Sequence, residues 1–220
     1  MSGAEPDWPA FIRANTRLLA PPLVPEIRLH LAEESLAVWR RTEEELGLMN
    51  VPPPYWAFAW AGGQALARYL IDNPSLVAEK RILDLGAGSG LTAIAAMRAG
   101  AAATLAADID AIALAAIGLN AAANATEVAT TAADLLGQAP AREFGVILVG
   151  DLFYERALAD RVLAFIEAAA ARGAVVLIGD PGRSYFPLGR FRAVAEYRVP
   201  VTRELEDSEI KRTSVWRLGS

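Results

Sequence analysis

From residue 80 onward, the hydrophobic positions form short apolar runs separated by longer stretches with helical periodicity. The apolar runs have the length of buried strands and lie at 81–85, 103–107, 128–132, 146–150 and 175–179. The helical stretches lie between them, at about 91–99, 111–123 and 156–171. Alternation of strands and helices at these lengths predicts a parallel sheet with helices on both faces.

The end of the chain has a different pattern. Residues 191–201 and 209–218 are rich in β-branched and aromatic side chains, and a polar segment at 203–208 joins them. Two such runs with a polar connection predict an antiparallel hairpin. We expect this hairpin to close the sheet, so that the chain has an α/β fold.

The first 55 residues lack this regular alternation. Their patterns predict a helix from Asp7 to about Leu19, a strand at 26–31 and a helix at 33–46, before an extended proline run at 52–54. We therefore expect two parts, an N-terminal extension over 1–55 and a main domain over 56–220.

The composition narrows the classes of protein to consider. The chain has 220 residues, of which 54% are hydrophobic, but 45 of them are alanine, which is only weakly hydrophobic. No apolar run is long enough to span a bilayer. The N-terminal residues show no signal or transit pattern, so we expect a cytoplasmic protein. The net charge of −5 argues against a nucleic-acid partner.

The residue types also limit the chemistry. There is no cysteine, and His30 is the only histidine. This removes disulfides, thiolate zinc sites, cysteine nucleophiles and the usual histidine triads. Any reaction must rely on carboxylates, aromatic side chains, backbone amides or a cofactor.

A glycine-rich loop follows the run at 81–85. Gly86, Gly88 and Gly90 stand where a strand turns into a helix, so the backbone amides there can approach a ligand closely. Leu91 occupies the position of the third glycine in the dinucleotide-binding motif. Asp84, two residues before the loop, suits a ligand with a positive group and would repel a pyrophosphate.

Acids also follow the next two apolar runs. Asp108 comes 18 residues after Gly90 and is placed to accept hydrogen bonds from both hydroxyls of a ribose. Asp134 ends the third run and could accept from an adenine amino group. Each aspartate alone could simply cap the following helix. Together with Asp84 and the loop, they predict a ligand with a ribose, an adenine and a cation, which is S-adenosylmethionine.

Three longer strings are more specific than the loop. They are WAGGQAL at 60–66, GDLFY at 150–154 and IGDPGR at 178–183, in this order. With them, the chain resembles the electron transfer flavoprotein beta-subunit lysine methyltransferases from about Pro25 to Trp216. Ala61 and Ala111 stand where proline is more usual in that family, but neither position carries a side chain that the chemistry needs.

The resemblance implies a Rossmann-like, seven-stranded methyltransferase sheet of order 3-2-1-4-5-7-6 with a terminal antiparallel hairpin. It implies an S-adenosylmethionine-dependent protein-lysine N-methyltransferase that acts on the electron transfer flavoprotein beta subunit and releases S-adenosylhomocysteine. We expect a monomer that needs no metal, nucleic acid or membrane. The implied cofactor-binding residues are Trp60, Asp84, Gly86, Ala87, Gly88, Gly90, Asp108, Ile109, Asp134, Leu135 and Asp151.

The implied acceptor site lies at the end of the fourth predicted strand of the main domain. Asp151 would orient the lysine ammonium and accept its proton, directly or through a water, unless it only caps the strand end. Phe153 and Tyr154 would form walls that contact the cationic substrate. A carboxylate favours the charged amine, whereas apolar walls disfavour it. Trp60 would pack on the methionine end of the cofactor or else in the core.

Other positions and functions stay open on the sequence alone. Asp180 could line the acceptor channel, Arg183 fits a turn, and His30 suits a structural or substrate-facing role. A ribosomal-protein lysine methyltransferase is the alternative with the same chemistry. A nicotinamide-dependent oxidoreductase, which Leu91 disfavours, and a non-catalytic cofactor-binding module are alternatives of other classes.

Overall fold

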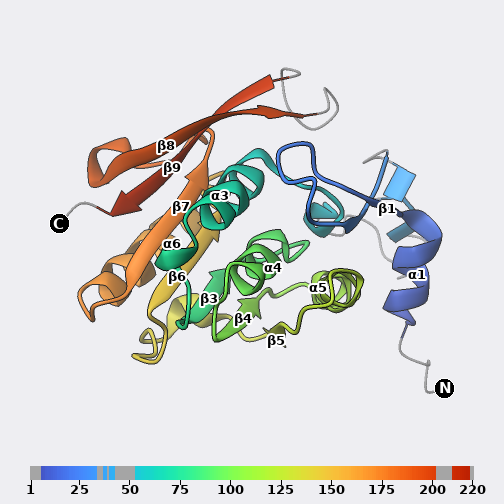
Figure 1. Cartoon of the computed structure of the whole chain (residues 1–220), viewed down its shortest axis with the longest axis horizontal. Helices are drawn as coiled ribbons and strands as arrows, with labels where there is room; N and C mark the ends of the chain where they lie inside the picture. Colours follow the sequence, from blue (N-terminus) through green and yellow to red (C-terminus); the bar gives the residue numbers. More distant parts are fainter. Residues whose placement is uncertain (1–5, 34–36, 39, 43–52, 202–209, 219–220) are drawn as a thin grey trace.

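A seven-stranded mixed sheet forms the centre of the molecule in a computed structural model that describes residues 6–33, 37–38, 40–42, 53–201 and 210–218 (Figure 1). Its strands are β3 (Arg81–Leu85), β4 (Ala103–Ala107), β5 (Ala129–Thr131), β6 (Val146–Gly150), β7 (Val175–Asp180), β8 (Phe191–Pro200) and β9 (Ile210–Leu218). The order β5-β4-β3-β6-β7-β9-β8 is the predicted 3-2-1-4-5-7-6 order, which is thereby confirmed.

The strand directions agree with the prediction as well. β5, β4, β3, β6 and β7 are parallel, while β9 pairs antiparallel with both β7 and β8. The chain leaves β3 toward β4 on one side and later returns to pair β6 on the other. Such a switch point opens a crevice at the carboxyl ends of the strands, where α/β proteins bind ligands.

Three helices of the main domain lie where the sequence patterns predict them, and another precedes the first strand of the sheet. They are α3 (Ala61–Asp72), α4 (Leu91–Arg98), α5 (Ala111–Ala123) and α6 (Arg156–Ala170), with single 3-10 turns η1 (Tyr55–Ala57), η2 (Pro74–Leu76), η3 (Leu135–Gly137) and η4 (Leu188–Arg190). In the part of the chain that the structure describes, no helix is long and apolar enough to cross a membrane.

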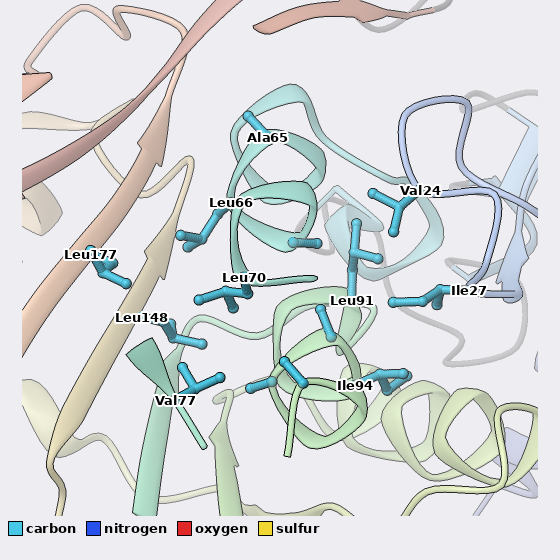
Figure 2. Packing of buried hydrophobic residues seen from close by; sticks show 14 of the residues in the cluster. Val24, Ile27, Ala65, Leu66, Leu70, Val77, Leu91, Ile94, Leu148 and Leu177 are labelled. Atoms are coloured by element: carbon cyan, nitrogen blue, oxygen red, sulfur yellow. The ribbon is translucent and has the colours of Figure 1, made fainter. Parts of the chain in front are cut away.

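The two faces of the sheet bury different clusters. Ile82 belongs to the cluster beneath α3 and α4, whereas its neighbour Leu83 belongs to the cluster beneath α6, because successive side chains of a strand point to opposite faces. Figure 2 shows Leu66 and Leu70 of α3 lying on the side of the sheet that carries Leu148. These two layers hold the carboxyl edge of the sheet in place.

The first turn of α3 lies unusually close to the end of β7. A Cβ atom on Gly62 would come within 2.2 Å of the Gly179 carbonyl oxygen, and one on Gly179 within 2.0 Å of the Gly62 oxygen. Only glycine at both positions allows this approach. This close contact places the N-terminus of α3 beside the strand ends that line the candidate site.

The N-terminal extension differs in part from its prediction. The first helix, α1 (Trp8–Asn15), ends before Leu19, because Arg17–Leu19 forms a strand, β1, that pairs antiparallel with β2 (Leu29–Leu31). Non-local pairing therefore overrides the local helical pattern. Residues 37–38 and 40–42 are helical within the predicted helix at 33–46, whose other central and C-terminal residues lie outside the described ranges.

Asn120 of α5 and Asn124, which caps the C-terminus of this helix, connect the extension to the main domain by hydrogen bonds. The Asn124 side chain accepts from the Arg28 N–H at 2.9 Å and donates to the Arg28 oxygen at 2.6 Å. Asn120 accepts from the His30 N–H at 2.7 Å and donates to the Ser89 oxygen in the glycine loop at 2.8 Å. The imidazole of His30 contacts the Thr16 hydroxyl, consistent with a structural role. The domain boundary at residue 55 stays a prediction.

Candidate functional site

A cavity of about 710 Å³ opens at the carboxyl ends of β3, β4 and β6. Its volume is in the range of small-molecule and cofactor sites. Its walls combine the glycine loop, acids that follow three strands, and aromatic residues at and after η1. Lining residues include Tyr55, Trp60, Gly63, Gly86, Ala87, Gly88, Asp108, Ile109, Asp134, Leu135, Asp151, Tyr154 and Arg183.

The glycine loop turns tightly over the end of β3. Gly86 and Gly88 line the cavity with φ angles of 60° and 51°, in the left-handed region that favours glycine. Gly90 also has a positive φ but caps α4 against Ile117 and is buried. Gly90 is therefore not among the residues that line the cavity, and its predicted contact with the cofactor stays a prediction.

Asp108 lies opposite the loop. Its Oδ2 accepts from the Gly88 N–H at 2.8 Å and its Oδ1 from the Asp110 N–H at 3.0 Å. Burial raises the pKa of Asp108, although these backbone hydrogen bonds counteract the effect. Each carboxylate oxygen can accept a further hydrogen bond. The position and chemistry of this side chain fit a pair of hydroxyl donors.

Asp84 does not reach the cavity. It points to the same face of the sheet as Ile82, is 1% exposed, and accepts a 2.5 Å hydrogen bond from the Thr92 hydroxyl of α4. Burial is the main cause that raises its pKa to about 7. The predicted direct contact between Asp84 and a cationic ligand is corrected: this carboxyl group joins β3 to α4 beneath the loop.

Asp134 lines the outer part of the cavity together with Ile109 and Leu135. Its Oδ1 accepts from the Leu136 N–H at 3.1 Å, and its Oδ2 lies 2.6 Å from Nη2 of Arg161 in α6. The hydrogen bond from Arg161 lowers the pKa of Asp134. The carboxylate therefore lies at the cavity as half of an exposed ion pair, and its predicted contact with an adenine stays a prediction.

Asp151 follows β6 directly, and the backbone turns sharply at this residue, so that its side chain reaches α3. Its φ of 57° is in the left-handed region, where aspartate is tolerated better than most residues. Its Oδ2 accepts from the Gly63 N–H at 2.9 Å, in the first turn of α3. A helix N-terminus stabilises negative charge. Asp151 as a whole residue is only 8% exposed, yet it lines the cavity.

Arg183 completes this corner of the cavity. Its Nη2 and Nε lie 2.7 and 3.2 Å from Oδ1 of Asp151, and its Cζ lies 5.5 Å from the centroid of the Trp60 ring. From the sequence, we assigned Arg183 only to a turn. The IGDPGR string that the sequence analysis singled out ends in Arg183. Local spacing does not show, however, that this arginine reaches across to the end of β6.

Aromatic side chains surround the pair. Trp60 lines the cavity with its ring 5.9 Å from Tyr55, and Tyr55 lies 5.5 Å from Tyr154. Sequence reasoning missed Tyr55, which follows the proline run. Phe153 is fully buried and packs edge-on against Phe186 at 5.1 Å. The expectation that Phe153 forms a substrate wall is corrected, because this ring belongs to the core beneath the site.

Asp180 lies behind Arg183 at the end of β7. It is fully buried, and its Oδ1 accepts 2.7 Å hydrogen bonds from the Gly182 and Arg183 N–H groups, while Oδ2 has no hydrogen-bond partner among the described residues. Burial, followed by the charge of Asp151, raises its pKa to about 7. Asp180 therefore supports the acceptor corner from inside the sheet and does not line the cavity.

The raised pKa of Asp180 predicts a stability effect. Between about pH 4 and 7 the folded protein binds this proton more tightly than the unfolded chain, so the free energy of unfolding falls as pH rises through that window. Asp180→Asn should remove this contribution and should raise stability relative to wild type by about 1–2 kcal/mol more at pH 8 than at pH 5. Urea unfolding at the two pH values measures it, and an equal effect at both would contradict the shift.

In the described part of the chain, no group of three or more His, Cys, Asp or Glu residues could hold a metal ion.

The glycine loop, the strand-end carboxylates and the sheet order together define a methyltransferase. The chain belongs to the electron transfer flavoprotein beta subunit lysine methyltransferase family, to which the most similar curated proteins that we compared are assigned by name.

The zebrafish (Danio rerio) member is 37% identical to this chain, over 98% of this chain and 85% of its own length. The mouse (Mus musculus) member is 38% identical, over 96% of this chain and 84% of its own length. The family model described as ribosomal protein L11 methyltransferase also matches residues 65–172. These comparisons support the methyltransferase class over the oxidoreductase alternative.

Solved structures agree on the fold. A magnesium protoporphyrin IX methyltransferase from Synechocystis, solved with bound S-adenosylmethionine, covers 71% of this chain and 78% of its own, with a TM-score of 0.52 and 14% identity. A putative RNA methyltransferase from Pyrococcus horikoshii covers 72% and 82%, with a TM-score of 0.53 and 15% identity. At these identities, the likeness concerns the fold alone.

Proposed function

We propose that this chain transfers methyl groups from S-adenosylmethionine to a lysine of the electron transfer flavoprotein beta subunit. The observation that carries the proposal is the corner formed by Asp151, Trp60 and Tyr154, where a carboxylate meets aromatic walls at the end of the cofactor cavity. The names of the relatives support the same substrate. The cytoplasmic location and the monomeric state stay predictions.

The cavity fits the proposed cofactor. Gly86 and Gly88 bring backbone close to the cavity, Asp108 presents carboxylate oxygens for ribose hydroxyls, and Ile109 and Leu135 add apolar surface for a base. When bound, S-adenosylmethionine would supply a methyl group carried on its sulfonium sulfur. The amine nitrogen would take the methyl group, and the sulfonium would become a neutral thioether.

The acceptor corner has to orient an amine and remove its charge. A lysine side chain is protonated at neutral pH, and the ammonium has no lone pair for attack. Asp151 can orient the incoming ammonium, and water beside it can carry the proton away. The aromatic rings of Tyr55, Trp60 and Tyr154 exclude other water and contact the aliphatic part of the lysine.

The direct test is incubation of the protein with labelled S-adenosylmethionine and purified electron transfer flavoprotein, followed by mass mapping of the modified residue. We expect label on lysine in the beta subunit. Ribosomal protein L11 is included because of the second family match. Label on L11 beside an unmodified beta subunit would contradict the proposed substrate.

The cofactor side of the cavity has its own test. Asp108→Ala removes both carboxylate oxygens that we assign to the ribose, and two hydrogen bonds to a charged group contribute about 1.5–3 kcal/mol each. The affinity for S-adenosylhomocysteine, measured by calorimetry, should fall by about a hundredfold or more. Asp160→Ala, at an exposed position of α6, should leave the affinity unchanged. An equal affinity in both variants would place the ribose elsewhere.

A further inference from the structure

Arg183 brings a second charge to the proposed acceptor corner. Its Nη2 and Nε both approach the same oxygen of Asp151, and its guanidinium lies over the Trp60 ring. The side chains of Arg183 and Asp151 are only 19% and 10% exposed, so solvent screens this pair weakly. Asp151 therefore enters the acceptor corner as one half of an ion pair.

The position of Arg183 is fixed from the backbone. The N–H groups of Gly182 and Arg183 both donate to Oδ1 of the buried Asp180, and the Phe186 N–H donates to the Arg183 oxygen at 2.9 Å. Gly182 has a φ of 90°, which lets the chain turn directly after β7. These backbone contacts therefore fix the point from which the Arg183 side chain reaches the acceptor corner.

The ion pair explains how the Asp151 carboxylate can lie beside an acceptor lysine that must lose its proton before it reacts. A lone carboxylate beside an amine favours the ammonium form, whereas a nearby cation and apolar surroundings favour the neutral form. When Arg183 balances the charge of Asp151, the apolar contact that the rings of Tyr55, Trp60 and Tyr154 offer the lysine side chain favours the neutral amine. A neighbouring cation is an established way to activate a lysine amine.

We propose that Arg183 is a positioning residue that acts through Asp151: it neutralises the carboxylate and thereby lowers the protonated fraction of the acceptor lysine. This inference rests on the proposed function, since it requires a lysine amine as acceptor. The proton leaves to water before the nitrogen reacts, so no further reactant is needed.

Other titratable groups lie behind the pair or line the same cavity. Asp180 lies behind it on β7, Tyr154 follows β6, Tyr55 belongs to η1 and Asp108 follows β4. Burial raises the pKa of Tyr154, which moves its ionisation away from neutral pH. Asp180 titrates near neutral pH, so each measurement is repeated in an Asp180→Asn background.

The test reads the protonation of the lysine directly. Flavoprotein beta subunit labelled with ¹³C at the lysine Cε is bound to the enzyme together with S-adenosylhomocysteine, and the Cε chemical shift of the acceptor lysine is followed against pH. We expect its pKa to be higher by about one unit or more in Arg183→Gln than in wild type, which lowers turnover at neutral pH about tenfold per unit. Turnover should recover at high pH.

Two further variants separate charge from shape. Arg183→Lys keeps the positive charge and should keep the wild-type lysine pKa, even where the contact with Trp60 is weakened. Arg190→Gln removes a charge from an exposed ion pair with Glu167 and should change neither the pKa nor the turnover.

The possible outcomes distinguish this inference from the proposed function. An unchanged lysine pKa in Arg183→Gln, or a pH-independent loss of turnover that Arg183→Lys does not restore, would overturn the role of Arg183. A wild-type enzyme that binds S-adenosylhomocysteine but modifies no flavoprotein lysine would overturn the proposed function instead. If Arg183→Gln does not fold, Arg183→Met, which also removes the charge, takes its place: a raised lysine pKa supports the inference and an unchanged one overturns it.

Discussion

Replacing Asp151 with asparagine should reduce methyl transfer at least about a hundredfold, the lower end of what a positioned acid–base group contributes. The affinity for S-adenosylhomocysteine should change little, because the loop and Asp108 hold the other end of the cavity. Asparagine is the appropriate substitution because it tolerates the φ of 57° at this position, whereas alanine would add backbone strain. Single-turnover transfer and calorimetry measure the two effects.

Asparagine at position 151 also affects folding. It removes the ion pair with the Arg183 guanidinium and changes the acceptor for the Gly63 N–H, so we expect a loss of about 1–3 kcal/mol in the free energy of unfolding. The matched control is Asp160→Asn, on the exposed side of α6, which should keep both activity and stability. Equal loss of cofactor affinity and turnover in Asp151→Asn would contradict the separation of cofactor and acceptor roles.

Gly62→Ala should destabilise the protein by about 3 kcal/mol or more and should disrupt the acceptor corner. The new Cβ would come within 2.2 Å of the Gly179 oxygen and 2.5 Å of Oδ2 of Asp151, and a backbone oxygen cannot move away without shifting β7 or α3. Overpacking of a well-packed interior typically costs 1–3 kcal/mol, and a rigid backbone neighbour places this site at the upper end, at about 3 kcal/mol or above. Denaturant unfolding measures the loss.

Gly63→Ala is the matched control one position along the same helix. Among the described residues, a Cβ at Gly63 would meet only Leu91 Cδ2, at 4.0 Å, which is ordinary contact. Alanine also favours a helix over glycine by about 0.5–1 kcal/mol, so this variant should be as stable as wild type or more stable. Similar losses in the two variants would show that the close approach of α3 to β7 does not cause the effect.

Much of the fold was predictable from the sequence. The strands β3, β4, β6 and β7 follow the predicted apolar runs closely because a buried parallel strand needs a continuous apolar run, which is a local property. The end of α1 was not predictable in this way. Residues Arg17–Leu19 have a helical pattern, but their pairing with Leu29–Leu31 depends on a segment ten residues away along the chain.

The candidate site was predictable only in part. Asp108 and Asp151 reach the cavity because both follow parallel strands whose carboxyl ends meet at one edge of the sheet. Asp84 is still inside its strand, so its side chain turns toward α4. After Asp151 the left-handed backbone interrupts the alternation of the strand, and therefore no periodic rule shows that Phe153 enters the core while Tyr154 faces the cavity.

The sequence by itself determined the class of fold, the glycine loop and the set of acids at strand ends, because each depends on the spacing of residues along one short segment. The tertiary structure decided which of these groups meet. The pairing of Arg183 with Asp151, the buried position of Asp180 and the approach of Gly62 to Gly179 join segments that are far apart in the chain. Such contacts depend on how α3, β6 and β7 pack together, and local periodicity carries no information about that packing.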